Sequence, residues 1–139
     1  MSNMRRPQPS EYDSVRVLIE TVVNETFSDL FAPSPVPLKF EDEDLPLAWV
    51  AVSDEKIVGM IITNHEWVSD LWVFRAHRKR GVGSELLAQG ESEIAARRHQ
   101  TCRLRVVRSN AFAAQFYLSQ GWQIAREFAH EKYHHAMLR

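Results

Sequence analysis

The most constraining feature of the sequence is a glycine-containing segment that stands between two apolar patterns. Residues 67–74 carry the bulky and β-branched side chains of a strand, and residues 81–97 place apolar side chains at helical spacing. Between them, residues 78–84 read Arg-Lys-Arg-Gly-Val-Gly-Ser. The start of a helix leaves backbone N–H groups without partners, and glycine lets an anion approach them without a Cβ in the way. The pattern predicts a strand, an anion-binding loop and a helix in succession.

The rest of the chain has the patterns of further short strands and helices. Apolar side chains at helical spacing predict a helix over residues 15–27, and the proline-rich residues 28–46 predict a loop or broken helical turns. Strands are expected at residues 4–6, 47–52, 57–63, 102–107, 122–128 and 132–138, with a short helix at 110–120. This order predicts a single α/β domain over residues 1–139, with a mixed sheet and helices on its faces.

Composition narrows the classes of partner. The 139 residues carry a formal net charge of −1, so no overall basic field indicates nucleic acid or an anionic membrane as partner. No apolar run is long enough to span a membrane. The single cysteine, Cys102, excludes an internal disulfide, and we interpret it as a small buried side chain in a reducing, cytoplasmic setting. A monomer and a homodimer are both compatible with this composition.

The residues after the second glycine constrain the anion. A mononucleotide P-loop has lysine directly after its last glycine, whereas Ser84 follows Gly83 here. A dinucleotide-binding loop has a third small residue three positions after its second glycine, where this chain has Leu86. Both nucleotide motifs are therefore excluded. A helix-opening glycine turn without any ligand stays open as an alternative at this point.

Two sequence motifs follow one another along the chain. The first contains Leu71-Trp72-Val73, Arg78-x-x-Gly81-x-Gly83 and Leu86-Leu87, and the second contains Asn110, Ala113, Phe116-Tyr117 and Gly121-Trp122. In this order and separation they resemble the acetyl-coenzyme A signature of the GNAT superfamily of N-acetyltransferases, over residues 48–128. The resemblance implies a single-domain GNAT fold. That fold has a mixed, mostly antiparallel sheet, splayed between its fourth and fifth strands, with helices on both faces.

The resemblance also implies acetyl-coenzyme A as the co-substrate. In the family, the loop equivalent to residues 78–84 binds the pyrophosphate mainly through backbone N–H groups. The strand equivalent to residues 71–73 opens a slot for the pantetheine arm through a bulge, and an N–H near Val73 would face the thioester oxygen. The coenzyme-binding residues implied are Leu71, Trp72, Val73, Arg78, Lys79, Arg80, Gly81, Val82, Gly83, Ser84, Asn110, Phe112, Ala113 and Phe116. For Asn110, a plain helix N-cap is an equal alternative.

Tyr117 is the candidate for the acid, and His65, Glu66 and Asp70 are the candidates for the base. Tyr117 matches the family tyrosine that protonates the departing coenzyme thiolate, and its alternative is a core aromatic residue. Glu66 and Asp70 are the carboxylates on the fourth strand from which the family often draws its base. Strand alternation places both on one face if no bulge intervenes, and an ordinary surface charge is the alternative for each. The mechanism implied is direct transfer in a ternary complex.

The expected acceptor is a primary amine on a small molecule, a peptide or a protein. The acceptor site would be lined by the acidic run at residues 41–44 and by Trp49, Trp67 and Trp72. Such an acidic lining would attract a cationic amine. A solvated charged loop is the alternative for the acidic run.

The sequence gives weaker support to a metal site and to other functions. His130, His134 and His135 fall on a predicted hairpin without a matching set of cysteines or carboxylates, so no metal is expected. A coenzyme-binding regulatory module that binds a protein partner is the main alternative function. Transfer of a larger acyl group, or transfer to an oxygen acceptor, also remains open.

Overall fold

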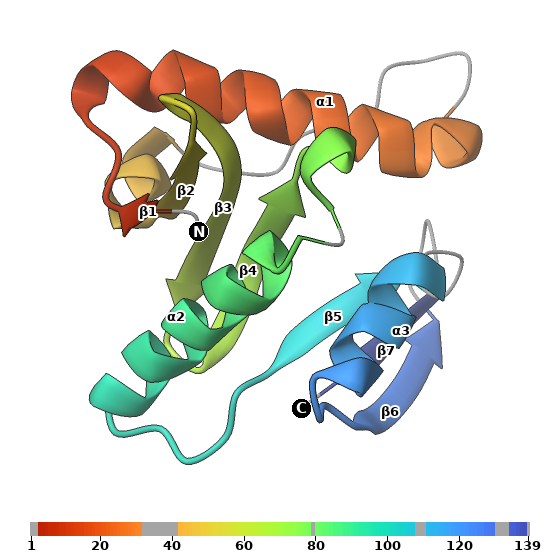
Figure 1. Ribbon diagram of the computed structural model, residues 1–139. Coiled ribbons are helices and arrows are strands. Elements are labelled where there is room, and N and C mark those ends of the chain that lie inside the picture. The colour runs from red at the N-terminus through yellow and green to blue at the C-terminus, as the bar shows by residue number, and fades with distance from the viewer. Residues whose placement is uncertain (1–2, 32–41, 79, 108–110, 130–133, 139) are drawn as a thin grey trace.

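The computed structural model describes residues 3–31, 42–78, 80–107, 111–129 and 134–138 (Figure 1). Its strands are β1 (Asn3–Arg5), β2 (Trp49–Ser53), β3 (Lys56–Asn64), β4 (Trp67–Val73), β5 (Leu104–Val107), β6 (Ile124–Ala129) and β7 (His134–Leu138). Its helices are α1 (Tyr12–Phe31), α2 (Val82–Ala96) and α3 (Ala111–Ser119), with short 3₁₀ turns η1 (Pro9–Glu11), η2 (Asp42–Leu47) and η3 (Arg75–His77). The predicted order of elements is confirmed. The predicted loop at 28–46 is wrong at its start, because α1 continues to Phe31 and only then meets the prolines that end a helix.

The strands form two antiparallel sheets that touch at one point. The first sheet has the order β1-β2-β3-β4, and the second has the order β5-β7-β6. The β4 and β5 strands meet in a parallel bridge between Trp67 and Arg103. There the Val68 N–H donates to the Arg103 carbonyl, and the Arg103 N–H donates to the Glu66 carbonyl, both at 2.8 Å. Beyond this bridge, the described residues of β4 and β5 form no ladder, so the predicted mixed, mostly antiparallel and splayed sheet is confirmed (Figure 1).

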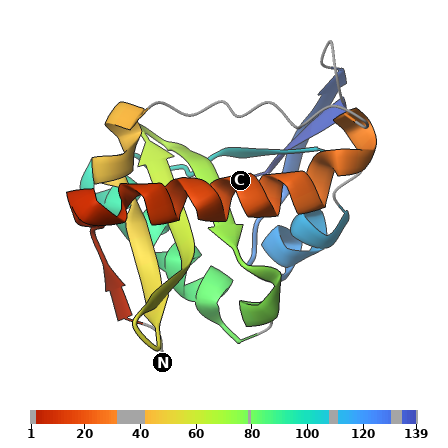
Figure 2. The same cartoon turned by 90° about the horizontal axis from the view of Figure 1, so that it is seen from above.

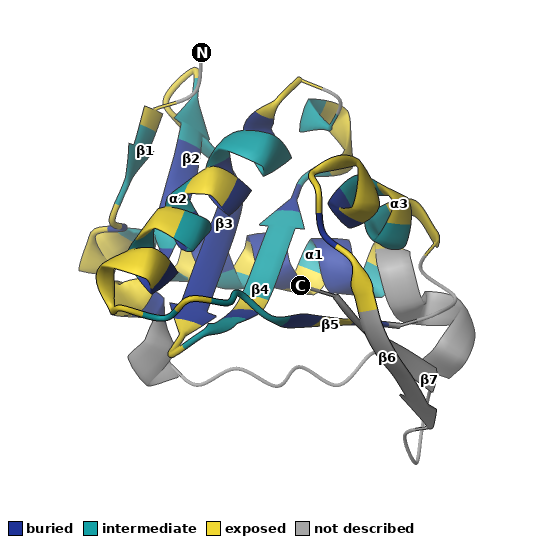
Figure 3. Ribbon diagram, turned by 90° about the horizontal axis from the view of Figure 1, so that it is seen from below, coloured by how far each residue is buried: buried dark blue, intermediate teal, exposed yellow. Residues whose placement is uncertain are grey.

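Helices cover both faces of the first sheet. The α1 helix crosses one face (Figure 2), and α2 packs on the other (Figure 3). Alternation along the strands supplies an apolar layer to each helix. The cluster beneath α1 contains Val15, Leu18, Ile19, Val22, Val50, Met60 and Ile62. The cluster beneath α2 contains Ala51, Val58, Ile61, Leu86, Leu87 and Ile94. Burial of each large side chain contributes about 2 kcal/mol, so these two layers fix α1 and α2 on opposite faces of the sheet.

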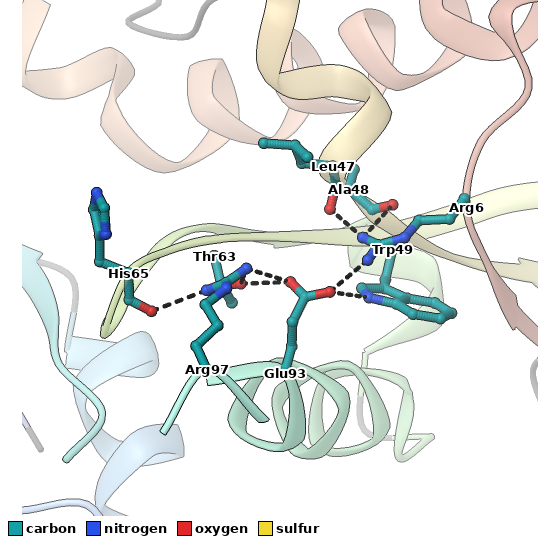
Figure 4. Close-up of polar contacts among 8 residues, drawn as sticks. All are labelled: Arg6, Leu47, Ala48, Trp49, Thr63, His65, Glu93 and Arg97. Carbon is teal, nitrogen blue, oxygen red and sulfur yellow. Dashed lines mark hydrogen bonds and ion pairs between the residues drawn. The ribbon is translucent and has the colours of Figure 1, made fainter. Parts of the chain in front are cut away.

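A nearly buried carboxylate ties α2 to the strands beneath it (Figure 4). The Glu93 side chain is 14% exposed. One of its oxygens accepts hydrogen bonds from the Thr63 hydroxyl at 2.6 Å and from Arg97 at 2.9 Å. The other accepts from the Trp49 indole N–H at 2.8 Å and from Arg6 at 2.5 Å. Burial alone raises the pKa of this carboxyl, but the donors outweigh burial and leave its pKa lowered.

We expect Glu93→Gln to lower the free energy of unfolding by about 2 kcal/mol at pH 7, because an amide N–H₂ would face donors. A lowered folded pKa stabilises the fold above the unfolded value, about 4.3, and this stabilisation is lost as pH falls through the folded pKa. The wild type should therefore lose its advantage over Glu93→Gln on acidification. Urea unfolding at pH 7 and at pH 3 measures both effects, with the exposed Glu20→Gln as control. Equal stabilities at pH 7 would contradict the assignment.

Candidate functional site

The backbone of β4 presents an unpaired edge toward the splay. Met60 pairs with Trp72 and Gly59 with Val73, and the Phe74 N–H donates to the Val58 carbonyl at 3.0 Å. In this antiparallel register the polar groups of Trp72 face β3, whereas those of Val73 face the opposite side, where β5 has diverged. Leu71, two residues earlier, has the same orientation. The predicted N–H at Val73 therefore faces the splay.

A bulge in β4 sets which side chains lie on each face. Ile62 pairs with Asp70 but Thr63 pairs with Val68, so Ser69 is an extra residue. Without it, Asp70 would share a face with Val68. With it, Asp70 shares the α1 face with Trp72, whose indole N–H donates to its carboxylate at 3.1 Å. The bulge places Asp70 on the face opposite α2.

The turn before α2 leaves donors open at the start of the helix. Gly81 has φ of 83°, a left-handed conformation that favours glycine, and no side chain caps the helix. The Glu85 N–H donates to the Gly81 carbonyl at 2.9 Å, so the N–H groups of the preceding first-turn residues have no acceptor within the helix. At Gly83, a Cβ would lie 3.3 Å from the Phe116 ring. This close approach forms a cradle that a side chain would fill.

These features border one cleft of about 640 Å³. It is lined by Val22, Leu71, Trp72, Val73, Arg75, Arg78, Gly81, Gly83, Ser84, Ala111, Phe112, Ala113, Phe116, Tyr117 and Gln120. The β4 edge and the loop form one wall, and α3 forms the other. The cleft therefore extends from the open helix start to the splay between β4 and β5.

Ten of the fourteen residues predicted to bind the coenzyme line this cleft, and two of the described ones do not. Arg80 is exposed outside it, and the Val82 side chain is buried in the α2 core, which leaves only its backbone for a ligand. Lys79 and Asn110 lie outside the described residues. The roles of all these residues remain predictions.

Four cleft residues were missed by the sequence analysis: Val22, Arg75, Ala111 and Gln120. Gln120 lies one helical turn after Tyr117, and this periodicity was a usable signal. Val22 enters through tertiary packing of α1, for which the local sequence carries no signal.

Tyr117 forms part of the buried end of the cleft. Its side chain is 8% exposed and contacts the rings of Phe116 and Trp122, with centroids 5.2 Å and 5.8 Å away. Burial raises the pKa of the phenol, and the negative charge of Asp70 raises that pKa further. The hydroxyl therefore stays protonated at neutral pH.

Glu66 lies at the end of the β4 strand region that is bridged to β5. Its carboxylate is 3.6 Å from the Arg103 guanidinium, at the closed end where β4 and β5 are bridged. Neither Glu66 nor Asp70 is among the described residues that line the cleft. Because the Ser69 bulge intervenes, the conditional placement of Glu66 and Asp70 on one face does not hold. Asp70 lies beside Trp72, which lines the cleft, whereas Glu66 lies beside Arg103 at the bridged end.

The predicted acceptor wall is only partly present at the cleft. The described part of the acidic run belongs to η2, which packs against β3 away from the cleft (Figure 2). Trp49 binds Glu93, and Trp67 stacks beneath Arg105 at 4.4 Å. Trp72 alone of these three tryptophans lines the cleft.

The charged residues at the cleft are instead cations. Arg78 donates to the Val73 carbonyl at 3.3 Å and lies over the Phe112 ring at 5.4 Å. Burial lowers the pKa of Arg78, and the neighbouring Arg75 lowers that pKa further. Arg75 is also 3.7 Å from the Glu25 carboxylate, so Arg78 is the main cation beside the open helix start, where positive charge favours an anionic ligand.

Within the described chain, no three histidine, cysteine, aspartate or glutamate side chains are grouped to hold a metal ion. His130 and the side chains of His134 and His135 lie outside what the structure describes. Of the helices that are described, none has the length and apolar character to cross a membrane.

Comparison with known proteins identifies the family. The Acetyltransferase (GNAT) family matches residues 17–122, and no curated protein sequence matches the chain. Among solved structures, PaiA N-acetyltransferase from Thermoplasma acidophilum in complex with coenzyme A has a TM-score of 0.80 at 17% identity, covering 99% of this chain and 98% of that one. Apo YjaB from Escherichia coli has a TM-score of 0.78 at 20% identity, covering 99% and 96%.

A third solved structure is similar to this chain over nearly its whole length. YncA, a putative acetyltransferase from Salmonella typhimurium with its cofactor acetyl-CoA, has a TM-score of 0.75 at 12% identity, covering 99% of this chain and 92% of that one. At such identities structural similarity establishes the fold, and the sequence match establishes the family. The chain therefore belongs to the acetyltransferase (GNAT) family.

Proposed function

We propose that the protein transfers the acetyl group of acetyl-coenzyme A to a primary amine by direct attack in a ternary complex. One observation carries this proposal. A single cleft joins the open first turn of α2, the unpaired edge of β4 and the buried phenol of Tyr117. An anion site, a backbone edge and a proton donor in this order match a ligand with phosphates at one end and a reactive thioester at the other.

The α2 end of the cleft suits the coenzyme's pyrophosphate. The N–H groups of Val82, Gly83 and Ser84 belong to the first turn of α2, and a Cβ at Gly83 would make a tight contact of 3.3 Å with the Phe116 ring. Arg75 and Arg78 supply positive charge. The complexes of PaiA with coenzyme A and of YncA with acetyl-CoA support the same ligand class for this cleft.

The β4 edge and Asp70 suit the reacting groups. Acetyl-coenzyme A supplies a thioester whose carbonyl carbon accepts the amine. The Val73 N–H faces the splay, where it would stabilise negative charge on that carbonyl oxygen. Asp70, on the α1 face, would take a proton from the incoming ammonium group directly or through one water molecule.

Tyr117 would assist the departure of sulfur. A phenol kept neutral by burial donates a hydrogen bond or a proton to the leaving thiolate. A C–N bond forms and the C–S bond breaks. One amine proton leaves through Asp70 to solvent, and the other balances the proton that the thiolate gains.

A thiol-release assay with acetyl-coenzyme A tests this function. The acceptor panel contains a polyamine, an aminoglycoside, free lysine and peptides with free N-termini. We expect turnover of at least one amine, with kcat reduced about 30-fold in Tyr117→Phe, the equivalent of one hydrogen bond to a developing charge. The coenzyme Kd should stay within about 2-fold, because phosphate contacts are untouched.

Other results of this assay would indicate a different function or a different substrate. Coenzyme binding without turnover of any acceptor would support the regulatory module in place of the enzyme. Faster turnover with butyryl- than with acetyl-coenzyme A would indicate a larger acyl donor. Turnover of alcohols alone would replace the amine with an oxygen acceptor.

A further inference from the structure

A buried tryptophan joins α2 to the C-terminal part of the chain. Trp122 is 5% exposed, and its indole N–H donates to the Glu91 carboxylate on α2 at 3.0 Å. The preceding Gly121 has φ of 91°, so the chain turns sharply after α3 and directs Trp122 back beneath it. A phenylalanine at this position would fill similar space without a donor.

The same tryptophan also contacts Tyr117. Its backbone N–H donates to the Tyr117 carbonyl at 3.0 Å. The two rings are tilted by 56° with centroids 5.8 Å apart. Trp122 is therefore bound to Glu91 through its indole nitrogen, and to Tyr117 through both its backbone and its ring face.

The position of Tyr117 relative to the cleft depends on contacts of this kind. The α2 helix packs on the four-stranded sheet and α3 on the three-stranded sheet (Figure 1), and the sheets are bridged only at the far end of β4 in the described chain. Near the cleft, the relative placement of α2 and α3 must come from side chains. Gly83 against Phe116 is one such contact, and Glu91 with Trp122 is another.

We propose that Glu91 and Trp122 are positioning residues that hold the Tyr117 hydroxyl at its place in the cleft. The proposal rests on the proposed function of Tyr117 as the donor to the leaving group. The Glu91 carboxylate fixes the indole, and the indole supports the Tyr117 ring from the side away from the ligand. Neither residue lines the cleft, so both act through Tyr117.

Steady-state kinetics with matched variants tests the proposal. We expect Trp122→Phe and Glu91→Leu each to reduce kcat about 10-fold, with the coenzyme Kd within about 2-fold of wild type. Glu91→Gln keeps an acceptor oxygen and should restore most of kcat. The matched control is Trp49→Phe, which removes an equivalent indole-to-glutamate bond on the same helix, to Glu93, away from the cleft. It should cost stability and leave kcat unchanged.

The Tyr117→Phe background separates positioning from general destabilisation. If Glu91 acts through the phenol hydroxyl, then Glu91→Leu should not lower kcat further once that hydroxyl is absent. A full additional 10-fold loss in Tyr117→Phe would overturn the proposal. Equal losses of kcat in Trp122→Phe and Trp49→Phe would overturn it too.

A spectroscopic measurement decides the question without turnover. In protein labelled with ¹³C-tyrosine, the Tyr117 ring signal is assigned by its loss in Tyr117→Phe. The chemical shift of this signal should change in Glu91→Leu and Trp122→Phe. It should be unchanged in Glu91→Gln and Trp49→Phe. An unmoved signal in Glu91→Leu would overturn the positioning role. If the signal shifts but no acceptor is turned over, the proposed function fails while the structural link stands.

Discussion

Gly83→Val should raise the Kd of coenzyme A by more than about 100-fold, the equivalent of losing two charge-assisted hydrogen bonds. A Cβ at this position would already lie 3.3 Å from the Phe116 ring, and the branched side chain would extend into the cleft. The phosphates would then be kept from the N–H groups of the first turn of α2. Isothermal titration calorimetry with coenzyme A measures the change directly.

The control for this variant lies on the same helix. A Cβ at Gly90 would lie 2.6 Å from the end of the Ile61 side chain, in the core and away from the cleft. Gly90→Ala should therefore cost about 1 kcal/mol of stability and leave the coenzyme Kd unchanged. Gly81 is a less specific test, because its positive φ makes any side chain strain the turn. If Gly83→Val is folded and binds coenzyme A with wild-type affinity, the loop does not hold the phosphates.

The local sequence pattern was sufficient to predict the wall of the cleft that β4, the glycine loop and α2 form. Strand alternation, the glycines at 81 and 83 and the helical spacing after them are properties of neighbouring residues, and they specified strand, turn and helix in order. The second motif contributed α3 in the same way. The splay itself came from the family resemblance and not from any property of one segment.

The face of each acidic side chain could not be predicted. The extra residue Ser69 is defined only by its partners on β3, Ile62 and Thr63, and cross-strand register is invisible in a single strand. A one-residue bulge reverses the faces of every later side chain, and so it separated Asp70 from Glu66. The acidic run was misplaced for a similar reason. Packing of η2 against β3, a tertiary contact, places its described part away from the cleft.

Asp70→Asn should reduce kcat by about 100- to 1,000-fold at neutral pH, the lower part of the roughly 10²- to 10⁴-fold range that a general base contributes. Asparagine keeps an oxygen for the Trp72 indole, so the local geometry should persist. The deficit should narrow as pH rises toward the acceptor's own pKa, about 10 for an alkyl amine, because more acceptor is then already deprotonated.

Glu66→Gln is the matched control, since it removes a carboxylate from the same strand region but at the bridged end, beside Arg103. It should change kcat by less than about 2-fold, because this partly exposed ion pair lies away from the cleft and contributes little. A reversed result, with Glu66→Gln inactive and Asp70→Asn active, would contradict the assignment of Asp70 as the base and the placement of Glu66 away from the reacting groups.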